Sequence, residues 1–91
     1  MSMTVRFFAY FRDVFGGKDV RVAAGDAATV GALLDRLGDT PKRRAELFVG
    51  TALKHHLVIM INGTPVPPDH PLAAPLKDGD VVAIFPLLGG G

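Results

Sequence analysis

The chain has no cysteine among its 91 residues. This absence excludes disulfide bonds, cysteine-ligated zinc and a persulfide formed on a thiol of the chain itself. Serine is nearly absent too, because Ser2 is the only one, and no serine nucleophile is indicated. Any sulfur that this protein handles must therefore sit on another group.

A charge excess and long apolar runs are also missing. The net charge is +1 and the pI about 8.2, so the chain lacks the basic excess typical of proteins that bind nucleic acid or a membrane surface. No uninterrupted apolar stretch exceeds that of residues 57–61, which is far too short to span a bilayer. The N-terminus shows no secretory signal. We therefore expect a cytoplasmic protein with protein or small-molecule partners, no nucleic acid and no membrane.

The length of the chain favours one domain over residues 1–85, followed by a flexible, glycine-rich tail over residues 86–91. A hydrophobic content of 48% is too high for a disordered segment. A core of this size buries about 60–65% of the surface of the unfolded chain, so a large internal substrate cavity is not expected. Chemistry is expected at an edge of the domain or in the pocket of a partner.

The first half of the chain changes from strand periodicity to helix periodicity. Residues 4–11 are rich in β-branched and aromatic side chains, and residues 19–23 alternate in the same way, so the two segments predict a hairpin. Thr29 is a predicted N-cap. Apolar side chains then recur at helical spacing before Gly38, where we expect a left-handed C-cap. The buried stripe of this helix consists of Val30, Leu33, Leu34 and Leu37.

The second half is predicted to add strands. Thr40-Pro41 resembles the start of a second helix, although the pattern is short and Gly50 interrupts it. Residues 57–61 are apolar on both faces and predict a central strand that enters a tight turn at Asn62-Gly63. The prolines that follow allow only an edge piece. Residues 81–85 form the last strand, which Pro86 ends.

This order of elements predicts an α+β fold. One main helix packs on one face of a small mixed sheet, which buries its leucine stripe. The first and last strands are expected to pair in parallel at the centre of the sheet. In this arrangement Val5, Phe7, Val82 and Ile84 face the helix.

Several of these motifs resemble the ubiquitin-like sulfur-carrier family (MoaD/ThiS-like), and most of all the small subunit of molybdopterin synthase. The match runs nearly from end to end, and its most specific part is a glycine pair that follows the last strand. The resemblance implies a β-grasp fold, in agreement with the element order. The motifs are Phe8-Ala9, Arg12, Thr29-Val30, Ile61-Asn62-Gly63, residues 77–82, and Phe85-Pro86 followed by Gly90-Gly91.

The resemblance implies that the chemistry takes place at Gly91. A partner enzyme adenylates the terminal carboxylate with ATP, and a sulfur donor then displaces AMP to leave a thiocarboxylate. The resemblance places no catalytic machinery, bound cofactor or metal on the chain itself. Glycine has no Cβ, so Gly89 and Gly90 would keep the tail thin enough to thread a partner's channel. Leu87 and Leu88 would anchor its base, and Pro86 would stiffen its exit.

The resemblance leaves the pathway open. Molybdopterin biosynthesis is the leading interpretation, with the chain as the small subunit of a synthase whose large subunit holds the pterin precursor. The alternatives are a sulfur carrier for thiamine, cysteine, tRNA thiolation or tungsten cofactor, and a ubiquitin-like modifier joined to lysines. On pattern alone the three terminal glycines also suit a linker remnant.

Strand alternation also predicts a docking surface. Residues that alternate with the helix-facing ones point to the other face of the sheet, which no second helix is expected to cover. An exposed apolar face beside the tail would suit the docking of the partner enzymes. The alternative is that residues 41–56 or a second copy cover this face. The predicted docking residues are Phe8, Tyr10, Val81, Ala83 and Phe85.

Overall fold

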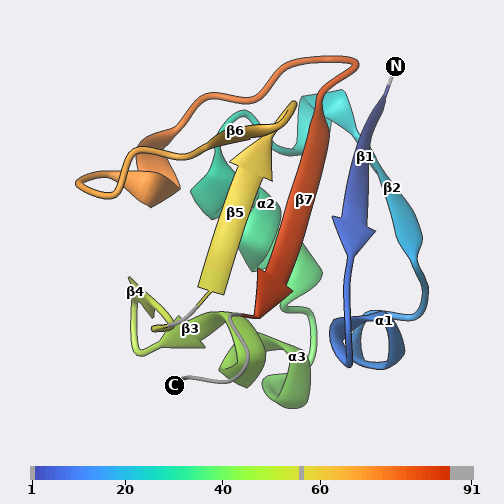
Figure 1. The fold of residues 1–91 in the computed structure, drawn as a ribbon, viewed down its shortest axis with the longest axis vertical. Helices are drawn as coiled ribbons and strands as arrows, with labels where there is room; N and C mark the ends of the chain where they lie inside the picture. Colours follow the sequence, from blue (N-terminus) through green and yellow to red (C-terminus); the bar gives the residue numbers. More distant parts are fainter. Residues whose placement is uncertain (1, 56, 87–91) are drawn as a thin grey trace.

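Five strands form one mixed sheet in the order β2-β1-β7-β5-β6 (Figure 1). The coordinates are those of a computed structural model, which describes residues 2–55 and 57–86. The strands are β1 (Ser2–Phe7), β2 (Asp19–Ala23), β5 (Leu57–Ile61), β6 (Thr64–Pro65) and β7 (Val81–Pro86). Two short 3-10 helices, η1 (Ala24–Asp26) and η2 (Pro71–Ala73), lie in the connections.

The strands β1 and β7 pair in parallel at the centre of the sheet, as predicted. Val5 lies opposite Val82 and Phe7 opposite Ile84, and all four side chains are fully buried. On its other side β7 pairs antiparallel with β5. The first strand and the last strand of the described chain thus share the middle of the core.

Helix α2 (Val30–Leu37) covers one face of this sheet (Figure 1). Its predicted N-cap is confirmed, because the Thr29 hydroxyl accepts a hydrogen bond from the backbone N–H of Ala32 at 3.2 Å. The four residues of the predicted stripe are all buried. The predicted α+β β-grasp architecture is therefore confirmed. In the part of the chain that the structure describes, no helix has the length and apolarity to cross a membrane.

The predicted left-handed C-cap at Gly38 is wrong. The φ angle of Gly38 is −83°, which any residue can adopt. A Cβ at this position would instead lie 3.1 Å from the Cα of Arg44 and 3.3 Å from the carbonyl oxygen of Leu34. Helix α3 (Pro41–Leu47), which Thr40 caps as predicted, begins immediately after α2 and packs against its end. Glycine is favoured here because two backbones approach closely.

The predicted strand over residues 4–11 is too long. β1 ends at Phe7, Ala9 has a φ angle of +54°, and α1 (Phe11–Val14) follows. The aromatic residues that mimic a strand pattern belong to the turn and helix between β1 and β2. Phe15 stacks on Phe7 with ring centroids 4.6 Å apart. These rings extend the core beyond the end of the strand.

Residues 41–55 contain more structure than the sequence indicates. After α3, a small hairpin forms from β3 (Phe48–Val49) and β4 (Ala52–Leu53), with Gly50 in the turn at a φ of +64°. This segment lies near the end of the sheet at which β7 ends (Figure 1). In Figure 1 neither α3 nor the hairpin of β3 and β4 lies across the sheet face opposite α2. The alternative that this segment covers the face is therefore wrong for its described part.

A buried carboxylate links the two turns at the other end of β7. The side chain of Asp80 accepts hydrogen bonds from the Asn62 side-chain amide and from the backbone N–H of Lys77, both at 2.9 Å. The Asn62 oxygen accepts the N–H of Val81 at 2.9 Å. Asn62 and Gly63 both have positive φ angles, of 50° and 83°, as the predicted tight turn requires.

The pKa of Asp80 follows from this environment. Burial by itself would raise the pKa, since the residue is only 3% exposed, but the hydrogen bonds from Lys77 and Asn62 and the charge of Lys77 outweigh it. The pKa therefore lies below its ordinary value. The ionised form stabilises the folded state at neutral pH, and this contribution disappears as the pH falls through the carboxylate range.

We expect Asp80→Asn to lower the free energy of unfolding by about 1–3 kcal/mol at pH 7, because two amide donors then face each other. The Asn62 amide cannot flip to relieve this, since its oxygen holds the Val81 N–H. The difference from the parent should begin to shrink below about pH 4, where the aspartate of the unfolded chain becomes protonated, and should vanish as the pH falls through the lower pKa of folded Asp80. Urea unfolding over a pH series measures it. The exposed Asp78→Asn is the matched control, and an equal loss in both variants would contradict the argument.

Candidate functional site

The candidate site surrounds the point at which β7 ends. Pro86, the last described residue, lies opposite Leu57 of β5, so the strand extends one residue beyond its predicted end. The central strand of the sheet thus directs the chain toward residues 87–91. The predicted tail residues Leu87, Leu88, Gly89, Gly90 and Gly91 lie outside the described residues.

The three predicted docking residues of β7 share the sheet face opposite α2. Val82 and Ile84 are fully buried, whereas Val81, Ala83 and Phe85 are half-buried and alternate with them. This alternation places the latter three on the open side of the sheet, as predicted.

The neighbouring strand β5 adds two apolar residues that the sequence analysis did not include. Val58 lies opposite Phe85 and Met60 opposite Ala83, and both are half-buried. The sequence does indicate that both faces of residues 57–61 are apolar. It does not indicate which residues of β7 they pair with, because this depends on the strand register. We use the name open-face patch for Val58, Met60, Val81, Ala83 and Phe85.

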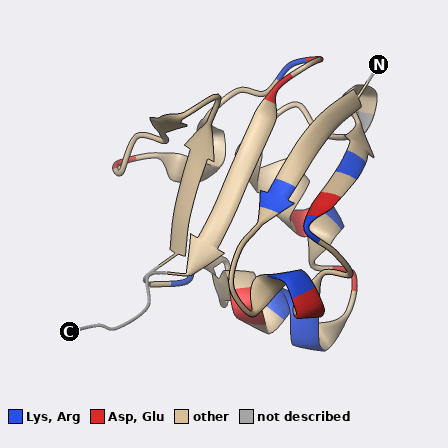
Figure 2. Cartoon of the chain, turned by 45° about the vertical axis from the view of Figure 1, so that its right-hand side comes forward, with Lys and Arg blue, Asp and Glu red and all other residues tan. Residues whose placement is uncertain are grey.

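The open-face patch has a polar border on its other side. In β1, Thr4 lies opposite Val81 and Arg6 opposite Ala83. Arg6 forms an ion pair with Asp19 of β2, with 3.6 Å between Nε and Oδ1. Figure 2 shows the same contrast, since β5 and β7 contain no charged residue, whereas β1, β2, α1 and α3 all carry charged residues. Among the strands of the open face, β5 and β7 thus form the apolar part of the surface.

Phe8 extends this apolar surface at the end of β7. It follows β1 directly, is 39% exposed, and meets Phe85 edge to face with ring centroids 5.4 Å apart. The guanidinium carbon of Arg12 lies 6.0 Å from the centroid of the Phe8 ring, and Arg12 Nε donates to the carbonyl oxygen of Phe7. Phe8 is therefore held at the predicted docking surface, although it is not part of a strand.

Tyr10 does not lie where strand alternation places it. It belongs to the turn before α1, packs edge to face on Phe11, and donates its hydroxyl to Glu46 of α3 at 3.1 Å. Burial, this hydrogen bond and the negative charge of Glu46 raise the pKa of Tyr10 above its ordinary value. The structure thus brings Phe8 and the β7 residues together and turns Tyr10 toward α3.

The described residues around the chain exit form a contact surface. No group of three or more histidine and acidic side chains within them is arranged to hold a metal ion. The open-face patch runs along β7 and reaches the chain exit at Phe85 and Pro86. This geometry suits the docking of a partner that acts on residues beyond Pro86.

The element order, the mixed sheet and the helix on one face define a β-grasp protein of the ubiquitin-like class. The model of the ThiS family matches residues 5–91, and the chain belongs to the ThiS family. It is also 36% identical over 92 residues to small archaeal modifier protein 3 of Haloferax volcanii, and the alignment covers all of both chains.

Solved structures agree with the family assignment. SAMP1 from Haloferax volcanii superposes with a TM-score of 0.81 at 32% identity, over all of both chains. A putative molybdopterin converting factor, subunit 1, from Pyrococcus furiosus gives a TM-score of 0.65 at 28% identity, over 94% of this chain and 97% of that one.

The Tyr10 contact can be tested directly, because Tyr10 is the only tyrosine. We expect a spectrophotometric titration of the folded chain to give a pKa above the ordinary value near 10, and unfolding in urea to restore that value. Glu46→Gln should lower the pKa of the folded protein, since it removes the carboxylate. Asp35→Asn removes a carboxylate that pairs with Arg44 instead and should leave the titration unchanged. An unshifted curve for Glu46→Gln would show that the contact does not form.

Proposed function

We propose that the chain is a ubiquitin-like carrier that a partner enzyme activates at the carboxylate of Gly91. A carboxylate oxygen attacks the α-phosphate of ATP, pyrophosphate leaves, and the product is an acyl-adenylate. A nucleophile then attacks the carbonyl carbon of Gly91, and AMP leaves with the bonding electrons. The partner enzyme binds the nucleotide, and this chain supplies only the acyl group.

The observation that supports this proposal is a full-length family match on a chain whose central strand leads directly to its glycine-rich end. From Pro86 an extended tail of residues 87–91 reaches about 17 Å. This length is enough to leave the domain surface and enter another protein. Glycines at positions 89–91 would leave the last part of the tail without side chains.

Two nucleophiles are compatible with this activation. A lysine amine would give an amide bond to a target protein, and the full-length similarity to a small archaeal modifier protein favours this fate. A sulfur donor would give a thiocarboxylate, which fits the ThiS family match. One pathway that would use such a thiocarboxylate is molybdopterin biosynthesis. The similarity to the Pyrococcus furiosus factor supports this pathway. The modifier relative is more similar, so conjugation is the first fate to test.

The open-face patch, with Phe8, is the docking surface in this proposal. It is apolar, adjacent to the chain exit and bordered by Arg6 and Arg12, as expected for an interface with an apolar centre and a polar rim. An enzyme that binds there holds the start of the tail at a fixed distance from its own active site. A sulfur-acceptor enzyme, such as a synthase large subunit, would use the same surface.

Activation at Gly91 is tested by intact mass spectrometry. The chain is incubated with ATP, magnesium, a sulfide source and the host's adenylating enzyme. We expect a mass gain equal to the exchange of one oxygen for sulfur, which deletion of Gly91 abolishes. A tagged chain in cell extract should in parallel form conjugates in which Gly91 is linked to lysine. If neither product forms with an enzyme that is active on another carrier, the proposal fails.

The docking role is tested by Phe85→Lys. We expect the rate of adenylation at limiting enzyme to fall at least about tenfold, because the loss of a hot-spot residue at the centre of an interface costs about 2 kcal/mol or more and about 1.4 kcal/mol is already tenfold. Val49→Lys is the matched control, since Val49 is 63% exposed and lies in β3 outside the patch. Circular dichroism checks the fold of both variants. Equal activation rates for Phe85→Lys and Val49→Lys would remove the patch from the proposal.

A further inference from the structure

The turn between β5 and β6 holds the only asparagine of the chain, Asn62, and the sequence contains no glutamine. Gly63 follows it, and the positive φ angles of both residues make this a type I′ turn. Asparagine is thermolabile, because its side-chain amide can react with the backbone nitrogen of the next residue. The reaction is fastest before glycine, which has no side chain to hinder that nitrogen. The two residues that the turn requires are therefore also the pair most prone to this reaction.

The reaction joins the side chain of Asn62 to the backbone nitrogen of Gly63. A base removes the proton of the Gly63 N–H, and the nitrogen attacks Cγ of Asn62. The bond from Cγ to Nδ2 then breaks, a proton from the solvent completes the ammonia that leaves, and a five-membered succinimide ring remains. Water opens this ring at Cγ to give aspartate, or at the backbone carbonyl carbon to give isoaspartate, in which the main chain runs through the side chain.

Both reacting groups are accessible to solvent. Asn62 and Gly63 are exposed, and within residues 2–55 and 57–86 the N–H of Gly63 donates no hydrogen bond. A Cβ at Gly63 would have no heavy atom within 4 Å apart from those of Gly63 and its chain neighbours. Water and base can therefore reach the turn, and neither has to enter the core.

Hydrogen bonds to Asp80 and Val81 restrain the amide of Asn62. Its oxygen accepts the N–H of Val81 and its nitrogen donates to the carboxylate of Asp80, both at 2.9 Å. The backbone N–H of Asn62 also donates to the carbonyl of Val81, at 2.8 Å. Cγ can therefore reach the Gly63 nitrogen only after the side chain has left both partners.

The backbone of the turn opposes the reaction as well. In a type I′ turn the first central residue has a ψ angle of about +30°, the mirror image of type I. This angle places the nitrogen of Gly63 nearly opposite Cβ of Asn62 across the Cα–C bond, whereas ring closure requires both on the same side. The folded turn therefore has to open before the ring can form.

Deamidation would change the charge beside a buried group. The carboxylate of Asp80 is buried and accepts from the Asn62 amide, so an aspartate at position 62 would place a second carboxylate against it. Two carboxylates at one site repel each other. Isoaspartate would also lengthen the backbone by one methylene group within the turn that pairs Ile61 with Thr64. Either product weakens the contact between this turn and the start of β7.

We propose that Asn62 is a site of spontaneous deamidation, which the hydrogen bonds to Asp80 and Val81 suppress in the folded chain and which destabilises the fold when it occurs. Water is the only co-reactant, and ammonia leaves. Since β7 carries part of the open-face patch and ends at Pro86, the modification acts on the strand that leads to the chain exit. The proposal goes beyond activation at Gly91 and is tested without it, so the two fail separately.

Intact mass spectrometry measures the reaction, because Asn62 is the only side-chain amide and every exchange of NH2 for OH therefore reports this residue. The full chain is kept at mildly alkaline pH, either folded or unfolded in guanidinium chloride. We expect the folded chain to react at least about tenfold more slowly, since two hydrogen bonds must break first. Equal rates would overturn the suppression, and an unfolded chain that does not react would overturn the site itself.

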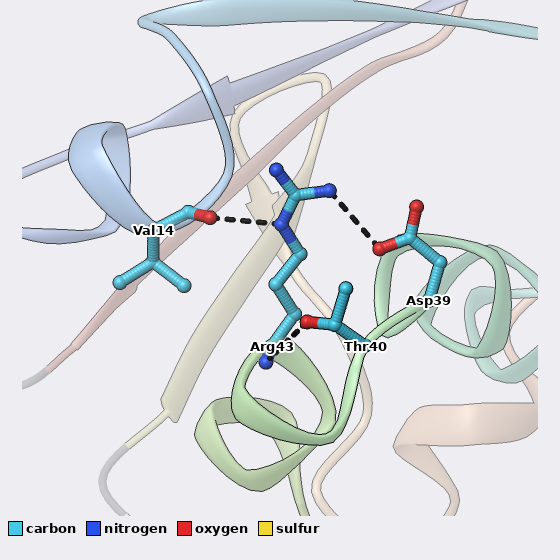
Figure 3. Close-up of polar contacts among 4 residues, drawn as sticks. All are labelled: Val14, Asp39, Thr40 and Arg43. Carbon is cyan, nitrogen blue, oxygen red and sulfur yellow. Dashed lines mark hydrogen bonds and ion pairs between the residues drawn. The ribbon is translucent and has the colours of Figure 1, made fainter.

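Asp80→Ala removes the acceptor of the Asn62 amide. It should speed the reaction of the folded chain at least about fivefold, because one of the two restraints is lost. Asp39→Ala is the control for the loss of a carboxylate, since Asp39 lies between α2 and α3 and accepts from Nη1 of Arg43 at 3.0 Å (Figure 3). Its rate should stay within about twofold of the parent, as expected for an exposed ion pair.

Val22→Ala is the control for lost stability, because it truncates a buried side chain of β2 outside the turn. The free energy of unfolding in urea gives the fraction of unfolded chain for each variant. If Val22→Ala speeds the reaction as much as Asp80→Ala at the same unfolded fraction, the reaction passes through global unfolding, and suppression by the turn contacts is overturned. Asp80→Asn, which weakens the same contact, replaces Asp80→Ala if that variant does not fold.

Asn62→Asp introduces the aspartate product directly. We expect its equilibrium constant for unfolding in urea at pH 7 to rise at least about fivefold, because the two carboxylates repel each other. The double variant Asn62→Asp with Asp80→Asn exchanges the two groups, so that an amide again donates to a carboxylate and the N–H groups of Lys77 and Val81 keep their acceptors. It should be more stable than Asn62→Asp alone. An Asn62→Asp chain as stable as the parent, or a double variant less stable than Asn62→Asp, would overturn destabilisation by the product.

Discussion

The pairing of β7 between β1 and β5 is the constraint on which the rest of the structure depends. Val82 and Ile84 of β7 lie against Val5 and Phe7 of β1, and the stripe of α2 packs on the face that these residues form. The alternate residues of β7 are thereby fixed on the opposite face, where they create the open-face patch. One register thus decides the core, the contact surface and the direction of the chain at Pro86.

Sequence periodicity predicts those parts of the fold in which one face is buried. It places Val5, Phe7, Val82 and Ile84 correctly, because burial leaves a local pattern. It also finds the N-caps Thr29 and Thr40, because capping leaves a local pattern as well. It fails for residues 8–11, because aromatic residues in a turn and a short helix look the same as an alternating strand. Gly38 shows a related limit, since the approach of Arg44 is a tertiary contact.

Only part of the candidate site can be predicted from the sequence, because the rest depends on tertiary contacts. The β7 residues Val81, Ala83 and Phe85 follow from alternation, but Val58 and Met60 join them through cross-strand pairing. Sequence periodicity also cannot predict that β2 is an edge strand, because this depends on the order of the strands in the sheet. Tyr10 was predicted on the docking surface from strand alternation, but it lies in the turn before α1 and contacts Glu46 instead.

The central place of β7 has a consequence for the order in which the protein is made and folded. Among the described strands, β7 comes last along the chain and its partner β1 comes first, so the contact of longest sequence separation closes the core. A nascent chain without residues 81–86 lacks the middle of its sheet and cannot gain native stability in stages. The ordered chain exit at Pro86 thus exists only once this contact has closed.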